Sequence, residues 1–234
     1  MPPRTDEQTS AIFDEWSDGY DADLQTKSMQ FGPLAGYTAS IEFAGQAVVR
    51  QVSGDDRLLD IGIGTGALAG QVILQHPQGA TLKVTGIDPS AGMRRRLSAS
   101  HPTIIVQDGD FLRIPAEDDG WDAIISSFAF HEVAPEQRKV ALDHVAAAVR
   151  PGGLVALLDI MFASPAALAQ AEARADGWDP TETYHFIADL DESLRTAGLT
   201  GLHRWQTAPM HWLATGQHGK SQKESIDPSN DAGN

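Results

Sequence analysis

A run of glycines directly follows an apolar, strand-like segment, which is typical of a loop that binds a ligand through its backbone. The run reads Leu58-Leu59-Asp60-Ile61-Gly62-Ile63-Gly64-Thr65-Gly66. Glycines at alternate positions allow a tight turn and leave backbone N–H groups open to a ligand. Asp60 stands at the mouth of this loop, where its carboxylate would repel a pyrophosphate and attract an ammonium group. The charge pattern therefore favours a ligand that carries a cationic group.

The same loop also matches a dinucleotide-binding pattern, so the glycines alone do not identify the ligand. The segment from Gly64 to Ala69 fits G-x-G-x-x-A, and Asp88 follows about 20 residues later, where a ribose-binding carboxylate is expected. Gly109-Asp110-Phe111 adds a carboxylate that can accept from an adenine amino group and an aromatic wall for the ring. Together with Asp60, these residues favour S-adenosylmethionine (SAM), and NAD(P) stays open as the alternative.

Alternating apolar and amphipathic segments predict the elements that position these residues. We expect a first series of strands near 57–61, 82–87, 103–107, 121–126 and 153–159, and helices near 67–76, 90–99, 136–149 and 186–197. Pro151-Gly152-Gly153 is expected to end a helix and start the fifth strand. Two more strands, 199–206 and 210–215, predict an antiparallel hairpin. The predicted fold class is α/β, a doubly wound and mostly parallel seven-stranded sheet with a C-terminal antiparallel hairpin and an N-terminal helical lid.

Three regions are expected along the chain. Residues 1–50 are expected to form a helical lid, with helices predicted near 8–18 and 38–52. Asp18-Gly19-Tyr20-Asp21 predicts a turn between them or a hinge of the lid. Residues 51–215 form the cofactor-binding core. Residues 216–234 have Ile226 as their single bulky apolar side chain and are expected to form a disordered tail.

Composition narrows the class of protein. A chain of 234 residues suits one α/β domain with a short accessory segment. Its net charge of −15 argues against nucleic acid as a partner, because phosphate backbones are bound mainly by clustered Lys and Arg. The sequence has no cysteine, which excludes disulfides. Neither a secretion signal nor a membrane-spanning stretch is recognisable, so we expect a cytoplasmic protein without a membrane partner.

Five stretches, in this order and spacing, resemble the class I SAM-dependent methyltransferase family from about Trp16 to Thr215. They are Leu59 to Gly66, Gly86-Ile87-Asp88-Pro89-Ser90 with Met93, Gly109-Asp110-Phe111, Phe128-Ala129-Phe130-His131-Glu132-Val133, and Arg150-Pro151-Gly152-Gly153. The resemblance implies that the loop would line the methionine part of SAM and that Asp88 would hold both ribose hydroxyls. The complete cofactor site that the resemblance implies consists of Asp60, Gly62, Gly64, Gly66, Asp88, Pro89, Met93, Asp110, Phe111, Ser126 and the lid residue Tyr20.

The acceptor side is less well defined by the sequence. Methyl transfer is an in-line displacement that depends mainly on positioning, and a general base is needed only for a protonated nucleophile. His131, just after the fourth predicted strand, is the candidate base, and packing is its alternative role. Trp178, Tyr184 and His185 lie where an inserted segment could line the acceptor pocket, or could pack within that segment.

The predicted function is transfer of a methyl group from SAM to a small organic acceptor at O, N, S or C, in specialised metabolism. No metal site is expected, because Asp159 has no partner ligands at a suitable spacing. Three alternatives stay open: an NAD(P)-dependent oxidoreductase, a catalytically silent SAM-binding scaffold, and a SAM-binding enzyme of another reaction such as decarboxylation or cyclisation. The sequence does not define the oligomeric state.

Overall fold

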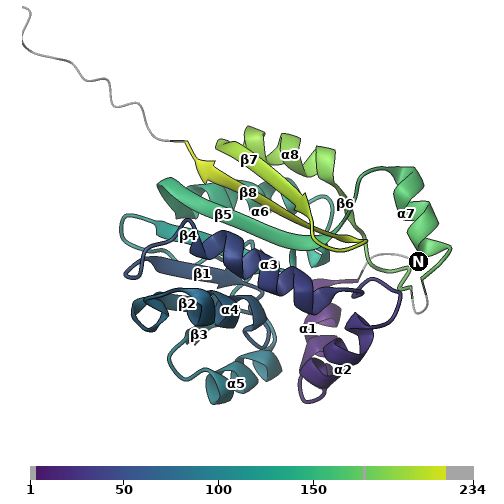
Figure 1. Ribbon diagram of the computed structural model, residues 1–234, viewed down its shortest axis with the longest axis horizontal. Helices are drawn as coiled ribbons and strands as arrows, with labels where there is room; N and C mark the ends of the chain where they lie inside the picture. The colour runs from purple at the N-terminus through teal and green to yellow at the C-terminus, as the bar shows by residue number, and fades with distance from the viewer. Residues whose placement is uncertain (1–3, 176–177, 220–234) are drawn as a thin grey trace, which may run out of the picture.

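One sheet organises the computed structural model, which describes residues 4–175 and 178–219. Its strands are β1 (Arg57–Ile61), β2 (Lys83–Ile87), β3 (Ile105–Gln107), β4 (Trp121–Ser127), β5 (Val149–Phe162), β6 (His185–Phe186), β7 (Leu199–Gln206) and β8 (His211–His218). Within the described residues, seven of them follow the order β3-β2-β1-β4-β5-β8-β7, and the two-residue β6 pairs with β5. The strands lie side by side through the middle of the molecule (Figure 1).

Parallel pairing dominates the sheet, as the sequence predicted. β1 is parallel to β2 and β4, β2 to β3, and β4 to β5. β8 is antiparallel to both β5 and β7, which confirms the C-terminal hairpin. The strand order reverses between β1 and β4, so the loops that leave the carboxyl ends of these strands diverge and open a crevice there.

Helices cover both faces of the sheet. They are α1 (Asp6–Trp16), α2 (Tyr20–Ser28), α3 (Tyr37–Val49), α4 (Ala67–Gln75), α5 (Ala91–Ser100), α6 (Arg138–Ala148), α7 (Pro165–Glu172) and α8 (Ile187–Thr196). Because strand side chains alternate between faces, Leu58 and Ile125 pack with α3, α4 and α5, whereas Leu59 and Ile124 pack with α6 and α8. The predicted doubly wound α/β fold is therefore confirmed. No helix in the described parts of the chain combines the length and apolar character needed to cross a bilayer.

The predicted lid segment, residues 1–50, divides into two parts. α1 and α2 lie beside each other beyond one end of the sheet (Figure 1). α3 instead packs against α4, β5 and β8, and its Ile41, Ala44 and Val48 are buried in the hydrophobic core. The reason is visible in the sequence of α3, whose apolar side chains need a partner surface. The lid is therefore limited to the first two helices, and α3 belongs to the core.

Several element boundaries differ from the sequence prediction. β5 begins at Val149, so Pro151-Gly152-Gly153 lies inside the strand, where the register against β4 shifts. Such irregular positions tolerate proline because a ladder hydrogen bond is already missing there. β8 continues to His218, past the predicted core boundary at 215, because its last residues still pair with β5. α2 and α7 were not expected as helices, and residues 220–234 of the predicted tail lie outside the described residues.

His185 in β6 is a buried histidine with an unmet hydrogen-bonding nitrogen. Its ring stacks on Phe130, with 4.6 Å between centroids and 9° between planes. Its Nε2 has no hydrogen-bond partner among the described residues. Burial, with a further contribution from the Arg138 guanidinium, lowers the pKa of His185 to about 3. The imidazole is therefore neutral in the folded protein at pH values where an unfolded chain would protonate it.

We predict that His185→Phe flattens the acid limb of the stability profile. An unfolded histidine has a pKa of about 6.5, so below that pH only the unfolded chain takes up this proton. The free energy of unfolding then falls as pH drops, by up to ~1.4 kcal/mol per pH unit from this residue. Urea denaturation at pH 7 and pH 5 should give a loss about 2 kcal/mol smaller in the variant.

The matched control is His144→Gln, which changes an exposed histidine on α6. Its stability loss between the two pH values should equal that of the wild type. An equal loss in His185→Phe and wild type would mean that His185 does not remain neutral in the folded protein.

Candidate active site

A cavity of about 330 Å³ opens at the carboxyl ends of β1, β2 and β4, where the strand order reverses. Residues of the two N-terminal helices, α1 and α2, form another wall of this cavity. Most of the residues predicted to bind a cofactor line it, namely Tyr20, Gly62, Gly64, Asp88, Pro89, Met93, Asp110 and Phe111. Asp60, Gly66 and Ser126 do not line it, and each has another position in the structure.

The loop after β1 needs its three glycines for different reasons. Gly62, Gly64 and Gly66 have φ values of 68°, 55° and 88°, a region that other residues enter at a cost of about 1–2 kcal/mol. A Cβ on Gly62 would lie 2.4 Å from the Cβ of Ala129, and one on Gly66 would lie 2.6 Å from Cδ1 of Leu97. A Cβ on Gly64 would meet no atom within 4 Å. The bare backbone at Gly64 therefore forms open floor of the cavity, whereas Gly66 serves the turn.

Asp88 follows β2 and ties two loops of the cavity floor together. Its Oδ2 accepts a hydrogen bond from the backbone N of Gly64 at 2.9 Å, and its Oδ1 accepts one from the backbone N of Ser90 at 2.8 Å. Burial raises the pKa of Asp88 above its ordinary value, although the two hydrogen bonds act in the opposite direction. Because this carboxylate also lines the cavity, it can accept hydrogen bonds from hydroxyl groups of a bound ligand.

Asp60 lies beneath the cavity rather than at its mouth. Ile61 and Gly62, which follow it, form the cavity wall themselves. Neither carboxylate oxygen of Asp60 has a hydrogen-bond partner among the described residues. Burial raises the pKa of Asp60 well above its usual range; the backbone of Ala69 offsets this in part, and the charge of Asp88 adds to it. An unpartnered buried carboxylate is costly, so a cationic group close to it would be stabilised.

Ser126 joins two strands instead of facing the cavity. Its Oγ donates to the carbonyl oxygen of Ile61 at 2.7 Å, which links β4 to β1. The next residue, Ser127, lines the cavity. Successive side chains of a strand point to opposite faces, so an error of one position along β4 exchanges a structural serine for a cavity residue.

A wall of mixed polarity stands beside the Asp88 carboxylate. Asp110 and Phe111 follow β3 and lie in this wall with Pro89 and Met93. The Asp110 carboxylate is oriented by an ion pair with Arg113 at 2.8 Å, and Phe111 is buried at 4% exposure. One acceptor group thus lies next to an aromatic face, and the use of this wall as an adenine site stays a prediction.

Aromatic side chains that sequence reasoning did not select close the rest of the cavity. Phe13, Tyr37 and Phe128 line it together with the predicted Tyr20. The rings of Tyr37 and Phe128 lie 4.8 Å apart. Phe128 has φ 52°, an uncommon conformation for a bulky residue that persists only where its surroundings determine it. Its place directly after β4, at the carboxyl end of a parallel strand, is the signal that could have identified it.

Polar contacts hold α1 and α2 over the cavity. Asp14 of α1 accepts a hydrogen bond from Ser90 Oγ at 2.6 Å and another from the backbone at the start of α5. Asp21 of α2 accepts one from Thr65 Oγ1 at 2.7 Å and pairs with Arg96 at 3.2 Å. The lid is therefore attached to the same two loops that form the cavity floor.

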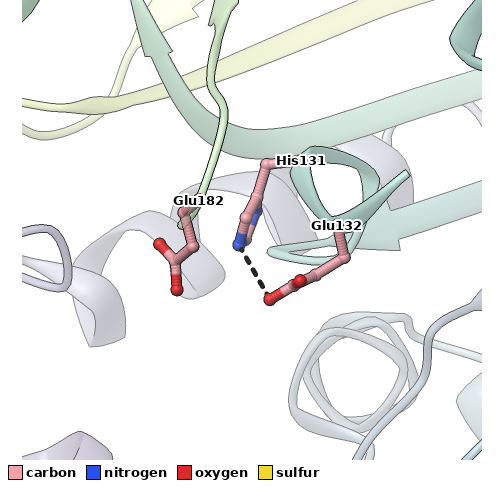
Figure 2. Close-up of side chains that lie close together, drawn as sticks. All are labelled: His131, Glu132 and Glu182. Atoms are coloured by element: carbon pink, nitrogen blue, oxygen red, sulfur yellow. Dashed lines mark ion pairs between the residues drawn. The ribbon is translucent and has the colours of Figure 1, made fainter. Parts of the chain in front are cut away.

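His131, the predicted general base, is buried next to the cavity but does not line it. Asp159 of β5 holds the residue by accepting from Nδ1 at 2.6 Å and from the backbone N at 2.9 Å. Nε2 lies 3.6 Å from Oε1 of Glu132, and Glu182 stands on the other side of the ring (Figure 2). Burial alone would lower the pKa of His131, but the Asp159 charge outweighs it and raises the pKa well above its ordinary value. His131 therefore meets the cavity only through Glu132, which lines it.

The predicted acceptor-pocket residues gather together, but away from this cavity. Trp178 and Tyr184 pack against each other at 5.2 Å between centroids, and both pack on Phe162. His185 stacks on Phe130, as described above. None of the three lines the cavity. Packing within the inserted segment, the alternative role considered for them, accounts for their positions, and residues of α1 form the cavity wall instead.

Comparisons with known proteins agree with this geometry. A family model described as a methyltransferase domain matches residues 58–153, which include the glycine loop, Asp88 and the segment after β4. An uncharacterised methyltransferase of Geobacillus kaustophilus is 31% identical over 186 residues, which cover 76% of this chain and 77% of that protein.

Solved structures share the fold at low sequence identity. The cyclase SpnF is 15% identical with a TM-score of 0.69, over 94% of this chain and 98% of that chain. Human N-acetylserotonin methyltransferase, in a complex with SAM, is 18% identical with a TM-score of 0.58, over 75% of this chain and 52% of that chain. With the site geometry and the extended match to a relative, the conclusion is that this chain belongs to the class I SAM-dependent methyltransferase family.

Proposed function

We propose that this protein transfers a methyl group from SAM to a small organic acceptor at O, N, S or C. The observation that carries the proposal is the combination of a bare glycine floor at Gly64 with the Asp88 carboxylate in one cavity. Bound SAM would supply a methyl group already activated by a sulfonium, so the protein's task is to hold an acceptor in line.

The residues present fit this cofactor. The unpartnered carboxylate of Asp60 beneath the floor would stabilise a nearby ammonium group, and Gly64 leaves room for a ligand against the backbone. Asp88 would accept from the ribose hydroxyls, and Asp110 with Phe111 would form the adenine wall. Pyrophosphate fits less well, since an ionised Asp88 beside the loop would repel it and Asp60 offers it no positive charge.

A small acceptor suits the remaining part of the cavity. The whole cavity, including the part assigned to SAM, measures about 330 Å³, at the small end of the usual range of small-molecule sites, so only a small acceptor would fit beside the cofactor. α1 and α2 partly cover the opening, and Phe13 and Tyr20 give it aromatic surface for an organic molecule. Glu7 and Glu132 are acidic residues on this side, and His131 is placed to orient Glu132. His131 as a direct general base stays a prediction.

A second reaction on the same cofactor site is the main rival. The fold resembles that of the cyclase SpnF, with a TM-score of 0.69, so cyclisation is the second candidate reaction. Calorimetric titration with SAM and with NAD separates the methyltransferase from an oxidoreductase. Release of S-adenosylhomocysteine during incubation with a panel of phenols, amines, thiols and carbon acids then separates methyl transfer from cyclisation and from a silent scaffold.

We predict that Asp88→Asn weakens SAM binding by about 10- to 100-fold, which corresponds to roughly 1.5–3 kcal/mol for a lost charged hydrogen bond. Calorimetry on the folded variant provides the measurement. The control is Asp108→Asn, which removes a nearby carboxylate that does not itself line the cavity and that pairs with Arg94 and with the lining residue Arg113. If both variants bind SAM as the wild type does, Asp88 is not part of the cofactor site.

Two glycine substitutions should separate binding from folding. Gly64→Ala places a methyl group in open cavity space, so we expect at least a tenfold loss of SAM affinity with a stability cost of only about 1–2 kcal/mol. Gly62→Ala adds a collision with Ala129 and should lower the melting temperature much further. Full SAM affinity in a folded Gly64→Ala variant would contradict the proposed position of the cofactor.

A further inference from the structure

Three side chains of types that can bind a metal ion lie close together at the edge of the cavity, and they come from two distant segments. His131 and Glu132 come from the turn after β4, and Glu182 comes from the segment before β6. One ligand atom from each lies within 4.8 Å of the others. Figure 2 shows the imidazole of His131 between the two carboxylates. We propose that His131, Glu132 and Glu182 form a binding site for a divalent transition-metal ion.

Asp159 supports this assignment from behind the ring. It accepts from Nδ1 of His131 at 2.6 Å, which fixes the ring orientation and leaves Nε2 as the free ligand atom. A carboxylate that holds the far nitrogen of a histidine is the usual outer partner of a metal-bound imidazole. Asp159 itself is 1% exposed and accepts two further backbone hydrogen bonds, so its position is fixed by the core of the protein.

Nε2 of His131 has an ion pair with Glu132 but no hydrogen bond among the described residues. The residue is 93% buried, since its exposed fraction is 7%. The nearest acceptor, Oε1 of Glu132, is 3.6 Å away and lies beyond hydrogen-bond distance. Without a metal ion, a proton on Nε2 would be the positive charge that faces this carboxylate. A metal ion would take that place and displace the proton from Nε2.

The position of Arg4 shows that this acidic cluster attracts positive charge. Its guanidinium lies 3.6 Å from Glu132 and 3.7 Å from Glu182, and it also pairs with Asp179. A side chain from the start of α1 therefore neutralises part of the acidic cluster. Because its contacts to both glutamates are long, a metal ion that binds them directly would compete with Arg4 rather than depend on it.

The donor set indicates which ions fit. One imidazole and two carboxylates suit Zn²⁺, Mn²⁺, Fe²⁺ or Co²⁺ better than the all-oxygen sites that Mg²⁺ and Ca²⁺ prefer. Ligand atoms lie about 2.0–2.2 Å from a bound Zn²⁺, so Glu132 and Glu182 would have to rotate to close the site. Glu132 now accepts a hydrogen bond from Thr9, and Glu182 accepts one from Tyr184. Glu132 belongs both to this cluster and to the cavity wall. A bound ion would therefore border the space that the acceptor occupies.

The test uses untagged, chelator-treated protein without SAM, so its result is independent of the proposed methyl transfer. Co²⁺ alone is titrated and followed by its visible d–d absorption, and Zn²⁺ alone is then added as a competitor. We expect saturation at one Co²⁺ per chain and loss of the absorption on addition of Zn²⁺. Absence of saturable one-to-one binding would overturn the proposal.

Matched variants distinguish a built site from general attraction to an acidic protein. Glu182→Gln should weaken Co²⁺ binding by at least ~10-fold, the scale of effect seen even for outer-shell partners. Asp179→Asn is the control, because it removes the same charge from the same segment and Asp179, like Glu182, pairs with Arg4. Asp179 is outside the ligand group, so the Co²⁺ affinity of this variant should stay within about threefold of the wild type. Arg4→Gln should tighten binding. Equal losses in Glu182→Gln and Asp179→Asn would refute the assignment, and Glu132→Gln repeats the test if Glu182→Gln does not fold.

Discussion

The cavity depends on one carboxylate that joins two loops across the sheet. Asp88 accepts backbone hydrogen bonds from Gly64 and from Ser90, so the loop after β1 and the start of α5 are fixed relative to each other. Ser90 in turn caps α5 and donates to Asp14 of α1. Removing the charge at Asp88 would therefore disturb the floor of the site and, through Ser90, the attachment of the lid. This linkage explains why an acid that lines the cavity is also nine-tenths buried.

The floor of the site could be predicted from the sequence because the residues that form it lie close together along the chain. A strand, a glycine turn and the acid at the end of the next strand follow each other in the chain, and parallel pairing brings the strand ends to one edge. Asp60 and Ser126 show the limit of this reasoning. The strands were identified correctly, but which side chain faces the cavity depends on a period of two, and Ser127 rather than Ser126 lines it.

The walls and the edge of the site could not be predicted in the same way, because they depend on contacts between distant segments. Phe13 and Tyr37 reach the cavity from helices far along the chain from the glycine loop. Asp159 had no partner by spacing, yet the pairing of β4 with β5 places it on His131. Trp178 and Tyr184 were expected near the acceptor on the basis of their position between elements, but packing on Phe162 satisfies both.

The floor of the cavity and the two helices of the lid are attached to the protein by different proportions of apolar and polar contacts. The floor is anchored by fully buried strands such as β1, whose Leu58 and Leu59 are 0% exposed on the two faces of the sheet. The lid is attached by polar contacts, including those of Asp14 with Ser90 and of Asp21 with Thr65, and also by Leu24 of α2, which is buried in the hydrophobic core. Water can replace such hydrogen bonds at a net cost of about 0.5–1.5 kcal/mol each, whereas exposing a buried leucine costs roughly 1.5–3 kcal/mol. By this comparison, separating α2 from the core would cost more than separating α1, because only α2 carries a buried leucine, Leu24.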